Sequence, residues 1–451
     1  MQARVAQSCK IVVLVWFLGV LIPLNLWWDN HTQFGASRKW TLCFPNADFS
    51  QYYIGGVAAR YGLWEHLYPK FKPEEASQPG RRIWSSKDAE ADPEVLAKIQ
   101  GLALEYVENC GPPPQALLCL PLSYFSFATA FKIWMTGLIV ATWGTLICAI
   151  RIYRRLGGTS GYLEGAIYLA GAFIPLLPRI GAGDNVMMFT VLCAGMAALS
   201  WVDRRPFQLG TCLIIPAVLK GLTASWCPLL LVRPVQWRTL GWMAGWTIFL
   251  NGLVLLLGGV APYTFWLHNI LPDVQSMEIQ QYWQHTMNLK GIAYVWGWKS
   301  FPAIFLKVIY LPGLLAVYLG FWRQRNSHGV EALGGICAAI VAALALFNLC
   351  NAVSWLPYVT YFLPFAGWAV MEYSHFSPTE KGRLKILAGI LFIIVPATHL
   401  LLARLVLSER ASDAGRDLYL GVELIFLVLA YRRLFCASPA ACGTVDDKNR
   451  T

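Results

Sequence analysis

Apolar runs of about 20 residues recur along almost the whole chain, and charged residues are confined to the gaps between them. A helix needs roughly 20 predominantly apolar residues to cross a bilayer. Hydrophobic residues make up 57% of the 451 residues and charged residues 14%, far more apolar than soluble domains. The pattern predicts an all-α polytopic membrane protein and excludes a β-barrel, whose strands would alternate in polarity.

About twelve transmembrane helices are predicted from these runs. The first run follows Lys10 and is too long for the apolar core of a signal peptide, so we interpret it as an uncleaved span. The fifth and sixth runs are short and meet at Lys220, as expected of two half-length helices beside a buried cavity. The predicted spans are 11–28, 126–150, 162–178, 185–202, 206–219, 222–232, 239–258, 302–321, 330–350, 355–373, 385–407 and 418–431.

Arginine and lysine residues predict the orientation of the spans. If the N-terminus is cytoplasmic, every strongly basic connection falls on the cytoplasmic side, as the positive-inside rule requires. We therefore expect a multi-pass protein of the cell membrane with both termini in the cytoplasm. The basic connections carry Arg151, Arg154, Arg155, Arg204, Arg205, Arg233, Arg238, Arg323, Arg325, Lys381, Arg383, Lys385, Arg432 and Arg433.

Two large loops, 29–125 and 259–301, then lie on the extracytoplasmic side. The stretch 52–68 in the first loop is amphipathic, and we expect it to lie as a helix on the membrane surface. Residues 1–434 are expected to form one transmembrane domain, and 435–451 a disordered cytoplasmic tail. The net charge of +11 comes from the connections rather than from one soluble face, so the expected partners are membrane lipids and not nucleic acid.

The cysteines predict at most one disulfide. Cys43 and Cys110 bracket the first outer loop and are predicted to pair in an oxidising compartment, with two free thiols as the alternative. Most other cysteines lie in apolar runs, where they pack as small hydrophobes. The chain has no CxxC pair and no ligand spacing for zinc or an iron–sulfur cluster, so no metal site is predicted.

Two ionisable residues near the outer ends of spans each have two possible roles. Asp48 precedes a helix predicted to begin at Ser50, where it either caps the helix or serves as a general base. Lys220 either extends its ammonium group to the bilayer surface or holds a phosphate diester. Physical chemistry alone leaves both choices open.

Three polar segments on the outer side are candidates for binding sugar or phosphate. Residues 179–185 contain glycines, an acid and an amide, which either cradle a phosphate or form an ordinary turn. Aromatic rings and amides in the second loop and near residue 355 either anchor the chain at the bilayer surface or pack against a sugar. The candidate residues are Arg179, Asn185, His285, Asn288, Lys290, Trp355 and Tyr358.

A series of short motifs runs in a fixed order through most of the chain. The motifs are Asp48-Phe49 with Tyr52-Tyr53, Gly62, Leu67-Tyr68, Pro113-Pro114, Asn185, Leu219-Lys220, and Ser354-Trp355 with Pro364. This series resembles glycosyltransferase family 87, whose members use polyprenyl-phosphate sugars and have the multi-spanning GT-C fold. Two motifs depart from the family: the second loop keeps only Leu289-Lys290-Gly291 of a longer motif, and Leu356 stands where histidine is common.

The resemblance implies a hexosyltransferase or pentosyltransferase of the GT-C type. It would move a mannose-like sugar, or an arabinofuranose-like one, from a polyprenyl-phosphate donor to an extracytoplasmic lipid or glycan acceptor. Asp48 would be the general base, Lys220 with Arg179 or Lys290 would hold the phosphate, and Tyr52, Tyr53 and the remaining candidates would hold the sugar or acceptor.

No metal and no other cofactor is expected, because the chain has no Asp-x-Asp triad. The alternative function is a transporter or flippase for a lipid-linked or small-molecule substrate. A transporter would be expected to contain two related repeats with broken helices, and the sequence shows no convincing repeat.

Overall fold

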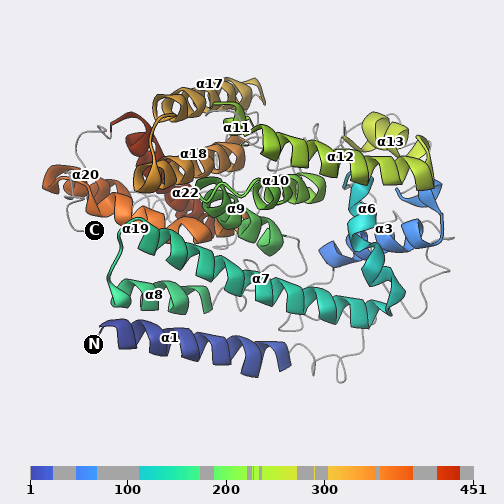
Figure 1. Ribbon diagram of the computed structural model, residues 1–451, viewed down its shortest axis with the longest axis horizontal. Helices are drawn as coiled ribbons and strands as arrows, with labels where there is room; N and C mark the ends of the chain where they lie inside the picture. Colours follow the sequence, from blue (N-terminus) through green and yellow to red (C-terminus); the bar gives the residue numbers. More distant parts are fainter. Residues whose placement is uncertain are drawn as a thin grey trace, which may run out of the picture.

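The computed structural model describes residues 2–23, 47–68, 111–172, 187–220, 226, 228–232, 236–271, 289, 303–350, 356–389 and 414–436. Within these ranges every regular element is a helix (Figure 1). The all-α prediction is therefore confirmed for the described part of the chain.

Four helices in the described part are long and apolar enough to cross a membrane. They are α1 (Gln2–Trp16) with its continuation η1 (Phe17–Leu21), α7 (Phe127–Arg155), α12 (Trp237–Gly258) and α18 (Gly329–Cys350). Shorter apolar helices are α9 (Met187–Val202), α10 (Pro206–Lys220) and α17 (Ala303–Arg323). The structure thus supports a membrane protein, while the predicted number of about twelve spans stays a prediction.

The remaining helices outside the two large loops range from four residues in α11 to 22 residues in α22. They are α8 (Gly161–Ala172), α11 (Leu229–Val232), η7 (Leu356–Phe365), α19 (Ala366–Ser374), α20 (Pro378–Gly389) and α22 (Ala414–Phe435). The predicted span 355–373 differs from the structure, because its first part is the 3₁₀ helix η7 and only α19 is α-helical. Proline lacks a backbone N–H and does not fit the interior of an α-helix, which accounts for the break around Pro364.

Helix α7 begins and ends at clear local signals. The Ser126 side chain caps its start by accepting a hydrogen bond from the Thr129 backbone N–H at 3.3 Å. The helix continues beyond the predicted end of the span at residue 150 and stops at Arg155, before Gly157, whose φ of 92° is left-handed. The predicted span ends at residue 150 because hydropathy falls at Arg151, whereas the helix itself continues until Gly157 ends it.

The core of the molecule is centred on α18. This helix is buried from Ala332 to Leu346 and packs against α22, α17 and α9. In contrast, α1 contacts mainly α8 and exposes one apolar face, and α12 exposes apolar side chains along most of its length. Such bare apolar helix faces are suited to lipid rather than to water.

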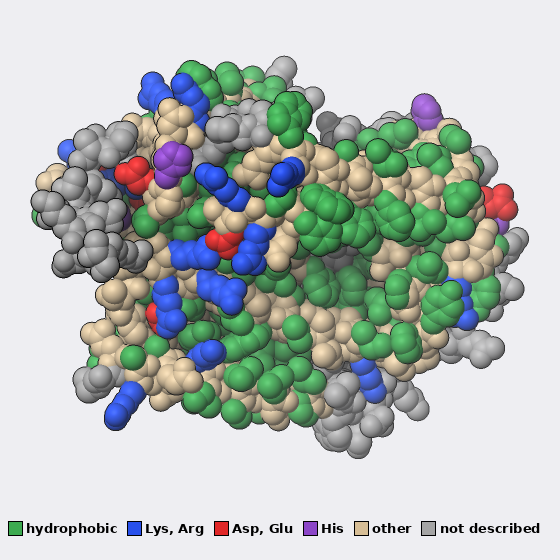
Figure 2. Space-filling model, viewed as in Figure 1, with side chains coloured by type: hydrophobic (Ala, Val, Ile, Leu, Met, Phe, Trp, Pro, Cys, Tyr) green, Lys and Arg blue, Asp and Glu red, His purple; other side chains and the backbone are tan. Residues whose placement is uncertain are grey.

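Charged helix ends meet at one end of the molecule, here called the basic end. Arg154 pairs with Glu164, Arg155 with Asp203, Arg432 with Glu380 and Arg433 with Glu372. Gln2 at the start of α1 lies directly against Gly161 at the start of α8, and Figure 2 shows the Lys and Arg side chains gathered in a band. The arrangement agrees with the prediction that these connections share one side.

The start of α20 shows how the basic end is fixed locally. Ser377 and Glu380 form a capping box, in which each side chain accepts a hydrogen bond from the other residue's backbone N–H. The hydrogen bond from Arg432, with those from Ser377, lowers the pKa of Glu380 to about 2. The carboxylate therefore stays charged and ties α20 to α22.

One expectation about the first outer loop is wrong. Helix α3 (Ala47–Arg60) is buried on all sides over residues 51–58 instead of lying on a surface with one exposed face. Its aromatic and small residues pack against α6 (Pro114–Cys119) and η3 (Leu120–Tyr124). Amphipathicity predicts that a face is buried, but it does not distinguish burial in protein from burial in lipid.

Candidate functional site

The candidate site lies at the end of the molecule opposite the basic end (Figure 1). There α3, α6 and η3 gather with η2 (Trp64–His66), α13 (Ala261–Phe265) and η6 (Trp266–Ile270). Helix α7 starts beside η3 and runs from this end to the basic end. The candidate site and the clustered arginines therefore lie at opposite ends of α7.

Asp48 is the second residue of α3, which begins at Ala47 and not at Ser50 as predicted. Because Ala47 is already helical, Asp48 occupies the first turn rather than the N-cap position. Both predicted roles of Asp48, stabilising the helix start and acting as a general base, stay predictions. A carboxylate in the first turn is still favoured by the positive end of the helix dipole.

Phe49 fixes the first turn of α3 to the start of α7. Its side chain is completely buried, and its ring lies 5.4 Å from Phe127, 5.5 Å from Phe131 and 5.5 Å from Trp134 between centroids. Aromatic pairs at such distances add to the free energy gained from burial alone. The backbone of the adjacent Asp48 is thereby held beside the start of α7.

The next turns of α3 are fixed by polar contacts to η3 and the residue after it. The Tyr53 hydroxyl donates to the Phe125 carbonyl oxygen at 2.8 Å, and Arg60 Nη1 donates to the Ser123 carbonyl oxygen at 2.7 Å. The Arg60 guanidinium also lies 4.4 Å from the centre of the Tyr124 ring. The sequence analysis did not predict this anchoring role of Arg60. The one feature that could have indicated it is a basic residue within an aromatic segment.

Tyr52 and Tyr53 are both buried in this structure, at 2% and 4% exposure. The Tyr52 ring packs 5.4 Å from that of Trp134. Burial raises the pKa of the Tyr53 hydroxyl, with Arg60 opposing the change, so the group remains a proton donor at neutral pH. These contacts hold α3 in place, and the predicted contact of both residues with sugar stays a prediction.

Close packing joins α3 to α6. A Cβ atom added at Gly56 would lie 2.5 Å from the Cys119 carbonyl oxygen, so only glycine permits this approach. Pro114 opens α6, and the Gln115 N–H bonds to the Pro112 carbonyl oxygen at 2.9 Å. Proline suits the first position of a helix, so these residues give α6 a rigid start.

Helix α6 also connects α3 to the helix that carries Lys220. It contacts α10 and α12 as well as α3. Since α10 starts beside the basic end and Lys220 is its last residue, Lys220 lies toward the candidate site. A common cavity for Asp48 and Lys220 stays a prediction.

Helices α12 and α13 close another side of this region. Gly258, the last residue of α12, packs against the Trp64 side chain, where an added Cβ would lie 2.5 Å from the indole. The Tyr68 and Phe265 rings stack 5.8 Å apart, and the Tyr68 hydroxyl donates to the Gly111 carbonyl oxygen at 2.9 Å. Described residues of both large loops, 29–125 and 259–301, therefore contribute to the same end.

The start of α9 is joined to η7. The Thr190 hydroxyl hydrogen-bonds to the Tyr361 hydroxyl at 3.1 Å within the core. Thr190 follows the predicted segment 179–185, and Tyr361 lies one turn of η7 after Tyr358. The structure thus brings together the helices that follow two of the predicted polar segments.

Several predicted residues lie outside the described part of the chain. They are Cys43, Cys110, Arg179, Asn185, His285, Asn288, Lys290 and Trp355. Among the residues that are described, no group of three His, Cys, Asp or Glu side chains could hold a metal ion. The disulfide and the metal-independent reaction stay predictions.

Comparison with known proteins tests the family resemblance. Neither the curated proteins nor the solved structures give a match. The family named Glycosyltransferase family 87 matches residues 110–347, just over half of the chain. Lys220 and the second loop lie within the matched range, whereas Asp48 precedes it and Tyr358 follows it. The chain belongs to glycosyltransferase family 87.

Proposed function

We propose that this membrane glycosyltransferase transfers a sugar from a polyprenyl-phosphate donor to an extracytoplasmic lipid or glycan acceptor. A mannose-like hexose is the favoured sugar, with a pentose as the alternative. Family membership and the apolar helices support a glycosyltransferase that works in a membrane. The donor brings the activated sugar, so no further cofactor is required.

The proposed reaction is a single displacement with inversion. Asp48 takes the proton of an acceptor hydroxyl as that oxygen forms a bond to the anomeric carbon. The bond between the anomeric carbon and the phosphate oxygen breaks, and its electrons leave with the polyprenyl phosphate. Lys220, with Arg179 or Lys290, stabilises the charge on the departing phosphate.

One observation carries the choice of Asp48 as base. The buried Phe49 locks the first turn of α3 to α7, and α6 links α3 to the helix that ends at Lys220. A base must be positioned closely relative to the reacting atoms, and rigid neighbours provide such positioning. Around it we assign Tyr52, Tyr53, Asn185, His285, Asn288, Trp355 and Tyr358 to binding of the sugar and the acceptor.

The reaction is proposed to occur on the extracytoplasmic side of the cell membrane. The candidate site lies opposite the basic end, and basic connections face the cytoplasm in most membrane proteins. Both termini are then cytoplasmic, because α1 starts and α22 ends at the basic end.

The test is Asp48→Asn, assayed in membranes with a polyprenyl-phosphate sugar and the acceptor that accumulates in a deletion strain. We expect transfer to fall by about 10² to 10⁴, because an amide cannot accept a proton. Glu65→Gln is the control, since Glu65 is a 79% exposed acid at the same end. Activity of Asp48→Asn within about threefold of the parent would remove Asp48 as the base.

Glycolipid profiling of the same deletion strain separates the proposal from the transporter alternative. Loss of a transferase should leave an acceptor that lacks one sugar. Loss of a flippase should instead leave an intact lipid-linked substrate on the cytoplasmic side.

A further inference from the structure

A second surface, far from the candidate site, combines unpaired arginines with exposed aromatic rings. Here the α10–α12 rim denotes Arg204, Arg238, Phe207, Trp237 and Trp242. It lies at the basic end, where α10 and α12 both begin. None of these residues has a role in the proposed reaction.

Helices α10 and α12 run side by side in the same direction from this rim. A Cβ atom added at Gly210 would lie 3.0 Å from Trp242 Cβ and 3.2 Å from the Thr239 carbonyl oxygen. The Phe207 and Trp242 rings meet edge to face with centroids 4.9 Å apart. Deeper along the pair, Trp246 Nε1 donates to the Thr211 hydroxyl at 3.0 Å.

Both arginines lie at the starts of these paired helices. Arg204 lies in the turn just before α10, three positions before Phe207, and Arg238 is the second residue of α12, four positions before Trp242. Because Phe207 and Trp242 touch, the chain segments that carry Arg204 and Arg238 begin from neighbouring helix starts. Both side chains are exposed.

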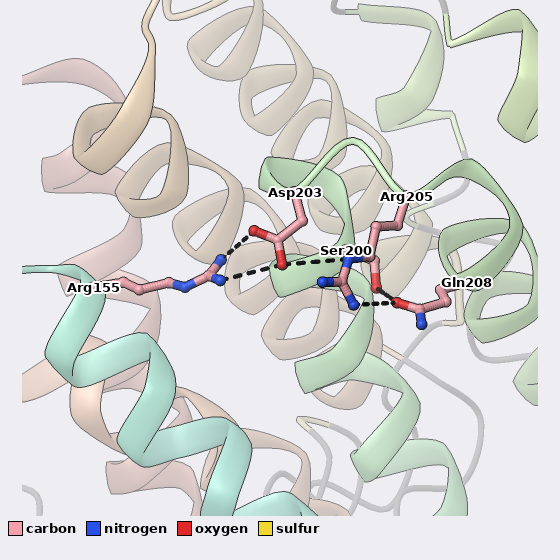
Figure 3. Close-up of polar contacts among 5 residues, drawn as sticks. All are labelled: Arg155, Ser200, Asp203, Arg205 and Gln208. Atoms are coloured by element: carbon pink, nitrogen blue, oxygen red, sulfur yellow. Dashed lines mark hydrogen bonds and ion pairs between the residues drawn. The ribbon is translucent and has the colours of Figure 1, made fainter.

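The nearby acidic group does not neutralise these two arginines. Figure 3 shows the Asp203 carboxylate between Arg155 and Arg205, with Gln208 and Ser200 completing the cluster. Within the described ranges, Arg204 and Arg238 make no ion pair and no side-chain hydrogen bond. Neither α10 nor α12 has an acidic residue in its first turn. The rim therefore carries uncompensated positive charge.

Elsewhere at the basic end, arginines have partners within the protein. Arg325 stacks on Trp322 at 4.0 Å, Arg432 pairs with Glu380, and Arg433 pairs with Glu372. What distinguishes the rim is that its two arginines adjoin exposed aromatic rings.

Exposed aromatic and aliphatic side chains adjoin the charges. Trp237 is 75% exposed, and Phe207 and Trp242 are each 47% exposed. Beyond them α12 continues with exposed apolar residues such as Ile248 and Phe249. A soluble anion would gain nothing from these groups, whereas a lipid offers a phosphate for the arginines and acyl chains for the apolar face.

We propose that the α10–α12 rim binds one anionic phospholipid from the cytoplasmic leaflet. Its phosphate lies between the Arg204 and Arg238 guanidinium groups, and its glycerol and upper acyl chains lie against Phe207 and Trp242. The lipid stabilises the parallel pair of α10 and α12. Since α10 also carries Lys220, this lipid would support the helix that reaches the candidate site.

The test uses native mass spectrometry of the full-length protein in neutral detergent, titrated with phosphatidylglycerol. The double variant combines Arg204→Gly with Arg238→Gln. Arg204 has a φ of 53°, a left-handed conformation that glycine adopts without strain, so this change should not disturb the turn. Each single substitution is measured as well, and Arg383→Gln in α20 is its matched control, because Arg383 is exposed at the same end and the change removes one charge.

We expect binding to weaken about fivefold for each rim arginine removed and to stay unchanged in the control. The parent should bind phosphatidylglycerol in preference to phosphatidylcholine and in the presence of excess inorganic phosphate. Binding by the double variant within about twofold of the parent would overturn the proposal. An equal loss of binding in Arg383→Gln would show a general effect of charge and would also overturn the proposal. Competition by inorganic phosphate would show a site for soluble anions, with the same consequence.

Discussion

At the residue scale, Phe49 holds the turn that carries Asp48, the candidate base, against helix α7. Its ring is completely buried among Phe127, Phe131 and Trp134, and Asp48 is its neighbour in the chain. Removing the ring leaves a cavity between α3 and α7 and frees the first turn of α3. Stability and catalysis should therefore fall together when Phe49 is truncated.

Phe49→Ala is predicted to lower the free energy of unfolding by about 3 to 5 kcal/mol, as buried Phe→Ala changes do. Sugar transfer per folded molecule should fall as well, because the position of Asp48 depends on this contact. Phe49→Leu should retain more of both. Thermal unfolding in detergent and transfer assays measure the two effects, with Tyr162→Ala on α8 as an exposed aromatic control. Parental transfer by folded Phe49→Ala would contradict the positioning role.

The sequence predicts part of this site and misses the rest for a physical reason. Asp48-Phe49 after a first apolar run is visible in the sequence, and so is Lys220 at the end of a short one. The role of Phe49 is not visible, because its partners follow it by more than seventy positions. Sequence motifs report which residues are present, whereas ring contacts depend on how α3 folds back onto α7.

At the element scale, the close contact between α3 and α6 depends on Gly56, because glycine has no side chain to keep the two helices apart. Gly56→Ala would place a methyl group 2.5 Å from the Cys119 carbonyl oxygen, and a backbone atom cannot move aside as a flexible side chain can. We predict a loss of about 1 to 3 kcal/mol in stability, in the range of overpacked cores, together with reduced transfer.

Gly252→Ala is the matched control for this change. Nothing lies within 4 Å of a Cβ atom added there on α12, and alanine favours a helix over glycine by about 1 kcal/mol. The control should therefore be as stable as the parent or slightly more stable in thermal unfolding. Equal behaviour of the two variants would mean that the α3–α6 approach is not tight in solution.

Hydropathy predicted the central helices well and the connecting ones poorly. Spans 330–350 and 239–258 nearly coincide with α18 and α12, because long apolar runs have few alternatives to a helix in lipid. Helix α3 and η7 were mispredicted, since their form depends on protein neighbours and on Pro364. Ion pairs such as Arg154–Glu164 also join separate helices, and the sequence offers no signal for them.

At the scale of the whole molecule, the two ends differ in chemistry. One end concentrates arginines, ion pairs and the proposed lipid rim, while the other concentrates aromatic packing, the end of α10 and the start of α3. This polarity suits an enzyme that is oriented by anionic lipid on one side and takes its substrate on the other.

The orientation is testable with single reactive cysteines and a membrane-impermeant maleimide. Cys436 is exposed just after α22 at the basic end, and Tyr61 is 45% exposed just after α3 at the other end. The parent background carries serine at the cysteines that are not buried in the described part of the chain and at those outside it: Cys9, Cys43, Cys110, Cys193, Cys227, Cys350 and Cys442. One version keeps Cys436, and the other combines Cys436→Ser with Tyr61→Cys.

We predict that intact cells label Tyr61→Cys, and that Cys436 is labelled only after the membrane is permeabilised. The reason is that translocating the arginine-rich connections across the bilayer is unfavourable, so the basic end remains in the cytoplasm. Buried cysteines such as Cys119 and Cys337 should stay unlabelled in both versions, because the reagent cannot reach them. Labelling of Cys436 in intact cells would place the basic end outside and would move the proposed transfer reaction to the cytoplasmic face.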